Sequence, residues 1–143
     1  IYVVGGDIED DEGEFVATDR VDMYDPAADS WQQLAAMPTA RSSHAAAIVD
    51  GKIYVSGGYA LTGDASDALE AYDPVTNTWA TLASLSEARA YHASAVINGK
   101  LYVFGGYLDG GRMDLVEVYS PASNSWASGL TFGIIAETVA VAL

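Results

Sequence analysis

Two arginine–histidine pairs with identical spacing are the residues of this 143-residue chain that are best suited to chemistry. Arg41 stands three residues before His44, and Arg89 stands three residues before His92. A guanidinium binds a carboxylate through two parallel hydrogen bonds, and an imidazole transfers protons or binds metals. Hydroxyl groups flank the pairs, on Ser42, Ser43 and Tyr91. These residues are therefore the first candidates for a binding or catalytic site.

Each pair has both a structural and a functional interpretation. His44 and His92 lie beside small apolar residues and lack further ligands at the spacing that a zinc site needs, so we expect structural hydrogen bonds from both. Arg41 and Arg89 are suited to internal ion pairs or to hydrogen bonds with backbone carbonyls. They are equally suited to present two fixed cations to a carboxylate of a partner. Both interpretations of the arginines remain open on the sequence alone.

Two tyrosines, Tyr59 and Tyr107, each follow directly after a pair of glycines. A tyrosine ring combines a large apolar face with a polar hydroxyl, which suits stacking on a sugar or on a side chain of a partner. The alternative is that both rings only pack against the loops in which they lie.

The chain is strongly acidic, with a formal net charge of −14 from 20 acidic and six basic residues. Nucleic acids and anionic membranes are bound by clustered lysine and arginine, so this balance argues against both as partners. Six acidic residues lie between Asp7 and Glu14, without the ligand spacing of an EF-hand loop. Runs of charge are usually solvated. We therefore expect no metal or other cofactor, and a basic surface of a partner is the better match.

The candidate residues belong to a pattern that occurs three times. An apolar run ends in two glycines at Gly5 and Gly6, Gly57 and Gly58, and Gly105 and Gly106. A tyrosine with a proline two residues later comes next, at Tyr24, Tyr72 and Tyr119. Seven residues further on lies a tryptophan, at Trp31, Trp79 and Trp126. The tryptophans are 48 and 47 residues apart, and self-similarity at such a period indicates a repeat architecture.

These landmarks closely resemble the repeat of the kelch family. The doubled glycine after an apolar strand, Tyr-Asp-Pro, the tryptophan, and Asp-Gly-Lys or Asn-Gly-Lys before the next strand all match in phase over nearly the whole chain. The resemblance implies an all-β fold, a β-propeller in which each repeat is one blade of four antiparallel strands. Residues 1–143 then form one incomplete propeller of about three blades, with repeat segments 1–52, 53–100 and 101–143.

Local patterns agree with such blades. The Asp-Gly at 50–51 and the Asn-Gly at 98–99 are typical of two-residue hairpin turns, which need positive φ at both positions. The runs at 45–47 and 93–95 consist of small residues and suit innermost strands, where blades crowd around an axis. The apolar run before each glycine pair is expected to form a strand that is buried on both faces.

The ends of the chain predict an incomplete ring, because closed propellers have about four to eight blades. The chain begins inside a second strand and ends in an apolar run, 138–143, that is typical of a first strand. We expect a fragment of a longer propeller. The rival hypothesis is a head-to-tail dimer, in which the last strand of one copy completes the first blade of the other. The third repeat is the least regular, because Ser120, Ala136 and Val139 replace the aspartate, arginine and histidine of the other repeats.

Alternate connections of an antiparallel blade emerge at opposite ends. The turns at 50–51 and 98–99 share one end with the Tyr-Asp-Pro turns and are uniform, whereas loops 7–19, 59–67 and 107–114 share the other end and differ from one another. Binding residues usually lie on variable loops of a rigid scaffold, so we expect any site there. The recurring glycines, tyrosines and tryptophans are expected to be structural, with the aromatic rings packed between blades.

Two classes of function remain open. Kelch propellers commonly act as platforms for protein interactions, and three unlike loops on a regular scaffold fit a module that binds a protein or peptide. Some kelch-type propellers instead act on sugars, as oxidases or as sialic acid isomerases. The copper oxidases of that group use a tyrosine crosslinked to cysteine, and this chain has no cysteine. It also shows no nucleophile–histidine–acid arrangement and no phosphate-binding glycine loop.

We therefore favour a binding module over a fragment of a carbohydrate-active propeller, and we assign no catalytic residue. Its candidate contacts are Arg41, Ser42, Ser43, Tyr59, Arg89, Tyr91 and Tyr107. The sequence leaves the cellular compartment open.

Overall fold

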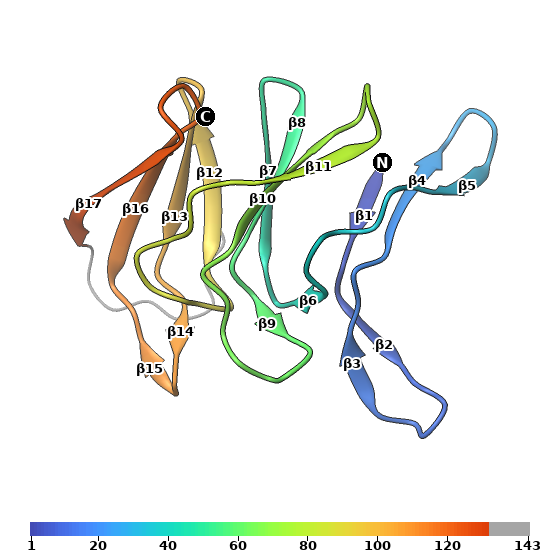
Figure 1. The fold of residues 1–143 in the computed structure, drawn as a ribbon, viewed down its shortest axis with the longest axis horizontal. Coiled ribbons are helices and arrows are strands. Elements are labelled where there is room, and N and C mark those ends of the chain that lie inside the picture. The colour runs from blue at the N-terminus through green and yellow to red at the C-terminus, as the bar shows by residue number, and fades with distance from the viewer. Residues whose placement is uncertain (132–143) are drawn as a thin grey trace.

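The computed structural model describes residues 1–131, and all regular structure in this range is β-strand. Three antiparallel sheets stand side by side as blades (Figure 1). The first blade has the order β1 (Tyr2–Val4), β4 (Val21–Asp25), β5 (Ser30–Gln33). The second has β7 (Ala45–Val49), β8 (Lys52–Ser56), β10 (Leu69–Asp73), β11 (Thr78–Thr81). The third has β12 (Ala93–Ile97), β13 (Lys100–Phe104), β16 (Leu115–Ser120), β17 (Ser125–Thr131).

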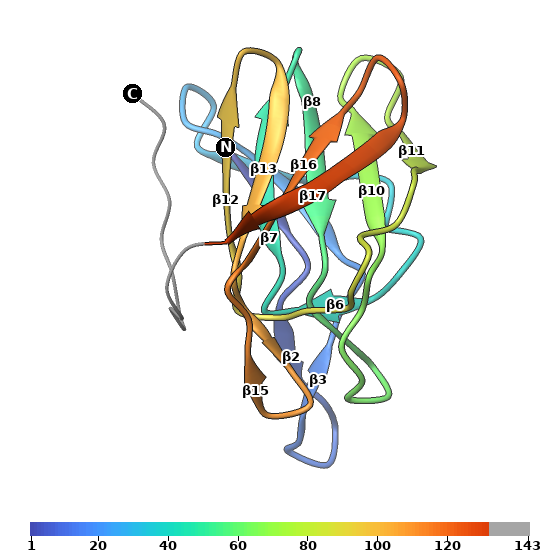
Figure 2. The same cartoon turned by 90° about the vertical axis from the view of Figure 1, so that its left-hand side faces the viewer.

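These sheets confirm the predicted fold class of antiparallel, four-stranded blades in an incomplete propeller. The second and third blades approach each other most closely along their first strands, because β7 lies beside β12. Both strands carry the runs of small residues that the sequence placed innermost. Figure 2 looks along the row of blades, with the third blade in front and the second behind it.

The two ends of the blades differ as predicted (Figure 1). One end, which we call the turn face, carries the short turns between β4 and β5, β7 and β8, and β10 and β11. The other end, which we call the loop face, carries loops 7–19, 59–67 and 107–114 and the links into β7 and β12. Its short strand pairs are β2 (Asp7–Glu9) with β3 (Phe15–Ala17), β6 (Arg41–Ser42) with β9 (Tyr59–Ala60), and β14 (Tyr107–Leu108) with β15 (Gly111–Arg112).

The hairpin turns of the second and third blades have the predicted backbone. The φ angles are +48° at Asp50 and +79° at Gly51, and +51° at Asn98 and +71° at Gly99. Positive φ at both central residues matches the turn to the right-handed twist of its strands. Five paired residues follow on each side of the turn between β7 and β8, from Val49↔Lys52 outward.

The glycine pair after β8 allows close contact on two sides. A Cβ on Gly57 would lie 2.4 Å from the backbone oxygen of Arg89 in the next blade. A Cβ on Gly58 would lie 2.5 Å from the backbone oxygen of Ser42 in its own blade. Both glycines also have positive φ, +58° and +97°. Two glycines are therefore required, because the first meets the neighbouring blade and the second meets the link of its own blade.

Apolar side chains fill both junctions between blades. The junction of the second and third blades contains Val49, Tyr54, Leu69, Ala71, Leu85, Leu101, Val103 and Tyr119. The junction of the first and second contains Val21, Met37, Ile53, Val55 and Tyr72. The indole N–H of Trp79 donates to the carbonyl of Ala35 at 2.8 Å, and that of Trp126 donates to Ala83 at 2.7 Å. Each of these tryptophans thus ties its blade to the link that leaves the preceding blade.

The first blade departs from two expectations. Trp31 is 60% exposed and its ring contacts Tyr24, with 5.0 Å between the centroids, so the prediction that all three tryptophans pack between blades is wrong for Trp31 in this chain. A tryptophan packs on the preceding blade, and the blade of Trp31 is the first of the three. The strand β1 is not buried on both faces either, since Val3 is 47% exposed. It pairs with β4 on one edge only.

Some expectations fall on residues that lie outside the described range. These are the strand at 138–143 and the substituted positions Ala136 and Val139. Within residues 1–131, no helix is long and apolar enough to cross a membrane.

Removing the indole of Trp79 should weaken the junction between the first two blades. The Trp79→Ala variant loses the packing of a large ring and the hydrogen bond to Ala35, so we expect a loss of about 3 kcal/mol in the free energy of unfolding. Val75→Ala is the control, because Val75 is 94% exposed on the turn face. Urea denaturation measures both variants, and equal stability of the two would contradict the assigned packing of Trp79.

Candidate functional site

The structure buries both Arg41 and Arg89, for which the sequence left internal ion pairs and surface cations open as alternatives. Arg41 and Arg89 are each 0% exposed. Nη2 of Arg41 lies 2.6 Å from Oε2 of Glu70 on β10, and Nη1 donates to the carbonyls of Gly57 and Ala68, both at 3.1 Å. The interpretation that Arg41 and Arg89 offer their charge to a partner is therefore corrected, because the carboxylate comes from within the blade and water and ligands are excluded.

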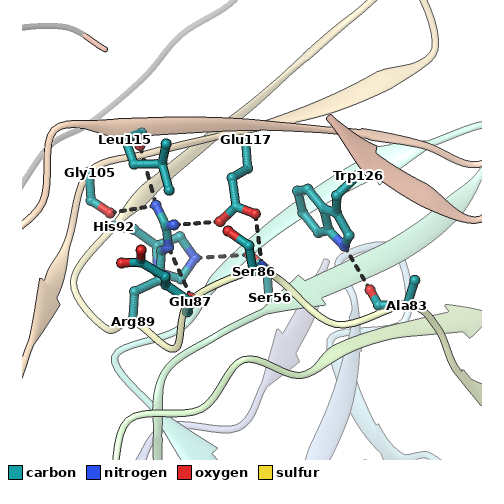
Figure 3. Close-up of polar contacts among 10 residues, drawn as sticks. All are labelled: Ser56, Ala83, Ser86, Glu87, Arg89, His92, Gly105, Leu115, Glu117 and Trp126. Carbon is teal, nitrogen blue, oxygen red and sulfur yellow. Dashed lines mark hydrogen bonds and ion pairs between the residues drawn. The ribbon is translucent and has the colours of Figure 1, made fainter. Parts of the chain in front are cut away.

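Arg89 repeats this arrangement in the third blade (Figure 3). Its guanidinium pairs with Glu117, which is 0% exposed, and donates to the carbonyls of Gly105 at 3.1 Å and Leu115 at 3.3 Å. Glu117 in turn accepts the N–H of Ser86 at 2.8 Å. The ion pair thus holds the link between blades against the strands that follow it.

The electrostatic surroundings of the two arginines are alike. Burial lowers the pKa of Arg41, and the charge and hydrogen bond of Glu70 oppose that shift. Burial likewise lowers the pKa of Arg89, and Glu117 opposes it. Guanidinium stays protonated in proteins, so each site is a charged pair in a dry environment.

Sequence reasoning missed the two glutamates. Glu70 and Glu117 each stand two residues before the tyrosine of a Tyr-Asp-Pro or Tyr-Ser-Pro turn, inside an otherwise apolar strand. An acidic residue that recurs at a buried strand position is the signal that identifies them, because such a charge needs a partner. In the first blade the equivalent residue is Asp22, which pairs with the exposed Arg20 instead.

The histidines contact the glycine pairs. His92 is 6% exposed, and its Nε2 shares a hydrogen bond with Oγ of Ser56 at 2.9 Å. A Cβ on Gly57 would lie 2.6 Å from Cε1 of this ring, so the imidazole fills the space that glycine leaves. Burial, helped by the nearby charge of Arg89, lowers the pKa of His92 to about 3. Burial also lowers the pKa of His44.

Three of the nominated tyrosines come together on the loop face. The ring centroids of Tyr59 and Tyr91 are 5.7 Å apart with a 70° angle between the planes, and those of Tyr91 and Tyr107 are 6.2 Å apart at 86°. We call these three residues the tyrosine cluster. Edge-to-face contacts of this kind are the favourable geometry for aromatic rings. Tyr91 is 48% exposed, whereas Tyr59 and Tyr107 are partly buried beside it.

The remaining nominated residues lie beneath or beside the tyrosine cluster. Ser42 is 7% exposed and pairs with Tyr59 in the β6–β9 ladder. The carbonyl of Ser43 accepts the N–H of Tyr91 at 3.0 Å, which joins the two links. Of the seven nominated residues, the two arginines and Ser42 are thus buried, and the three tyrosines form a partly exposed layer.

An acidic hairpin forms another part of the loop face. The strands β2 and β3 pair from Asp7↔Ala17 to Glu9↔Phe15. The side chain of Asp10 closes the turn, because its Oδ1 accepts the N–H groups of Glu12 and Glu14, both at 2.9 Å. No group of three histidine, cysteine, aspartate or glutamate side chains within residues 1–131 is placed to hold a metal ion.

The second and third blades have four antiparallel strands each, glycine pairs lie at both junctions, and the indoles of Trp79 and Trp126 tie these two blades to the links that precede them. These features define a kelch-type propeller. A family model, the KLHDC2/KLHL20/DRC7 kelch-repeats domain, matches residues 1–139. The chain therefore belongs to the kelch-repeat family.

Individual relatives match over shorter stretches. Kelch-like protein 33 from Homo sapiens is 41% identical over 63 residues, which cover 44% of this chain and 11% of the relative. Kelch-like protein terF from Aspergillus terreus is 44% identical over 64 residues, which cover 43% of this chain and 14% of the relative. The solved structure of YjhT superposes with a TM-score of 0.84 at 20% identity, over 94% of this chain and 50% of YjhT. The chain thus spans 11% to 14% of these curated relatives and half of the solved protein.

Neutralising one partner of the buried ion pair should destabilise the third blade. Glu117→Gln keeps the size of the side chain and leaves Arg89 charged and buried, so we expect a loss of about 3–5 kcal/mol in unfolding free energy. Arg20→Gln is the matched control. The side chain of Arg20 is itself 59% exposed in its ion pair with Asp22, so this variant should lose less than about 1 kcal/mol. Urea denaturation reports both. Equal losses would show that burial of the pair has no energetic consequence.

The free energy of unfolding should fall as the pH is lowered, because His92 is buried in its neutral form. Its pKa is about 3 in the folded chain and 6.5 as the ordinary value, so the unfolded state binds the extra proton. The contribution of neutral His92 is therefore complete above about pH 6.5 and is lost as the pH falls toward 3, on the order of a few kcal/mol in all. Thermal unfolding between pH 7 and pH 4 should show a shallower pH dependence for His92→Gln than for the unmodified protein. Identical slopes would contradict this assignment.

Proposed function

We propose that this chain is part of a protein-interaction module that binds a segment of a protein partner through its loop face. The observation that carries the proposal is the tyrosine cluster, in which Tyr59, Tyr91 and Tyr107 converge from three separate segments. Exposed tyrosine rings offer large, rigid contact areas and a polar hydroxyl, which makes them frequent anchors of protein interfaces.

The distribution of repeated residues supports the same face. Glycines, tyrosines and tryptophans that recur in every repeat pack within or between blades, with the exception of exposed Trp31. The loops at 7–19, 59–67 and 107–114 differ in length and composition. Loops that vary on a rigid scaffold are the usual location of binding residues. Family membership adds to this proposal, since kelch propellers commonly act as interaction platforms.

A carbohydrate-active propeller is the second candidate, because an exposed tyrosine ring also suits stacking on a sugar. The buried state of Arg41 and Arg89 removes the charged groups that would have bound an acidic sugar at this site. Within the described residues, the loop face therefore favours a peptide over an anionic sugar.

Panning of a random peptide library against the full-length protein tests the proposal. We expect peptides that bind the unmodified protein and lose most of their affinity for a Tyr59→Ala/Tyr107→Ala variant, while Val75→Ala on the turn face binds normally. A glycan array on the same proteins is the counter-test. Sugar binding that disappears with the two tyrosines, without any peptide that depends on them, would replace the proposal with the carbohydrate alternative.

A further inference from the structure

Tyr91 has a backbone conformation that does not suit its side chain. Its φ angle is +52°, in the left-handed region that bulky residues rarely adopt. The equivalent residue of the preceding repeat, Ser43, has the same φ of +52°. The conformation therefore belongs to the repeated link, whereas the tyrosine ring occurs in only one of these two links.

Hydrogen bonds on both sides impose this conformation. The N–H of Tyr91 donates to the carbonyl of Ser43 at 3.0 Å, and Ala90 exchanges two backbone hydrogen bonds with Tyr107, at 3.0 and 2.9 Å. Glycine would meet the same backbone requirement without strain. Residues held in unfavourable backbone regions cluster at binding sites. The ring of Tyr91 contacts Tyr59 and Tyr107 and still leaves 48% of the residue exposed, so these contacts explain only part of its surface and the rest is available to a ligand.

The charge around the tyrosine cluster restricts the ligand. Loops 7–19, 59–67 and 107–114 hold eleven of the 20 acidic residues and only one of the six basic residues, Arg112. Asp64 and Asp109 are exposed in the two loops that begin with Tyr59 and Tyr107. The negative electrostatic potential of these acidic residues attracts a cationic ligand and repels an anionic one.

The tyrosine cluster itself supplies the complementary contact. A guanidinium or ammonium group over the face of a tyrosine is attracted by the π electrons of the ring. The single cation of the three loops already lies at the cluster, because Nε of Arg112 donates to the hydroxyl of Tyr107 at 3.3 Å. The half-exposed ring of Tyr91 remains open to a second cation from outside.

We propose that Tyr91 is the recognition point for an arginine or lysine side chain on the partner, with the acidic loops as the surrounding field. This inference rests on the proposed function and names the chemistry of the partner segment. The ring of Tyr91 contacts one arginine or lysine side chain of the partner. The carboxylates of the loop face favour further positive charge along the partner segment.

Binding of two defined peptides to the full-length protein tests the inference. The probes are fluorescein-labelled peptides of equal length, one of alternating glycine and arginine and the other of alternating glycine and glutamate, followed by fluorescence anisotropy at low salt. The arginine peptide should bind and the glutamate peptide should not. Tyr91→Gly leaves the charge unchanged. The relief of backbone strain offsets the loss of the ring contacts with Tyr59 and Tyr107, so the melting temperature should change little while the affinity falls about fivefold or more.

A second variant predicts a change of opposite sign. Arg112→Gln removes the competing cation, so it should raise the affinity for the arginine peptide. If the site instead recognised carboxylates, the same variant would lower its affinity for the ligand. Val75→Ala, on the turn face, is the matched control and should leave the affinity unchanged. Unaltered binding to Tyr91→Gly, or weaker binding to Arg112→Gln, would overturn the inference.

The two proposals fail in different ways. If panned peptides depend on Tyr59 and Tyr107 but carry no excess of arginine or lysine, the cationic partner is wrong and the interaction module stands. If no peptide of any charge depends on the tyrosine cluster, the interaction module itself is wrong.

Discussion

The contact on which the rest of this structure depends is the close approach of two backbones where blades meet. The N–H of Gly58 donates to the carbonyl of Arg89 at 2.8 Å, and a side chain on Gly57 would collide with that same oxygen. The junction of the first two blades repeats the contact, since Gly6 donates to the carbonyl of Arg41 at 3.0 Å. At Gly57 and Gly58, only a residue without a Cβ that also tolerates positive φ allows this approach, which is why β8 ends in two glycines.

The close approach determines what happens to the charged side chains beside it. An arginine whose carbonyl lies in the junction has its own side chain enclosed by the blade, so a carboxylate must be enclosed with it. Glu70 and Glu117 meet that need from β10 and β16. Buried ion pairs contribute little to stability compared with apolar packing. Removing only one partner, however, is strongly destabilising, because it leaves the other charge buried and unpaired. Their effect here is to set where the link between blades lies.

The same organisation leaves the loop face free to differ from repeat to repeat. The link that carries Ser43 in one repeat carries Tyr91 in the next, with the same backbone angle and a different side chain. Packing therefore accounts for the conformation at this position, and the identity of the side chain needs a different reason. The cationic partner proposed above would supply that reason, because it fits an acidic face with three clustered tyrosine rings.

The sequence by itself determined the blades, because glycine pairs, Asp-Gly and Asn-Gly turns and small-residue strands act locally and recur with one period. It also indicated which end of the blades carries variable loops. Only the tertiary structure decided that Arg41 and Arg89 are internal, since their partners lie 29 and 28 residues away and are chosen by strand register. It alone brought Tyr59, Tyr91 and Tyr107 together and left Trp31 exposed. Contacts between blades depend on which surfaces face each other, and a pattern that is identical in every repeat does not carry that information.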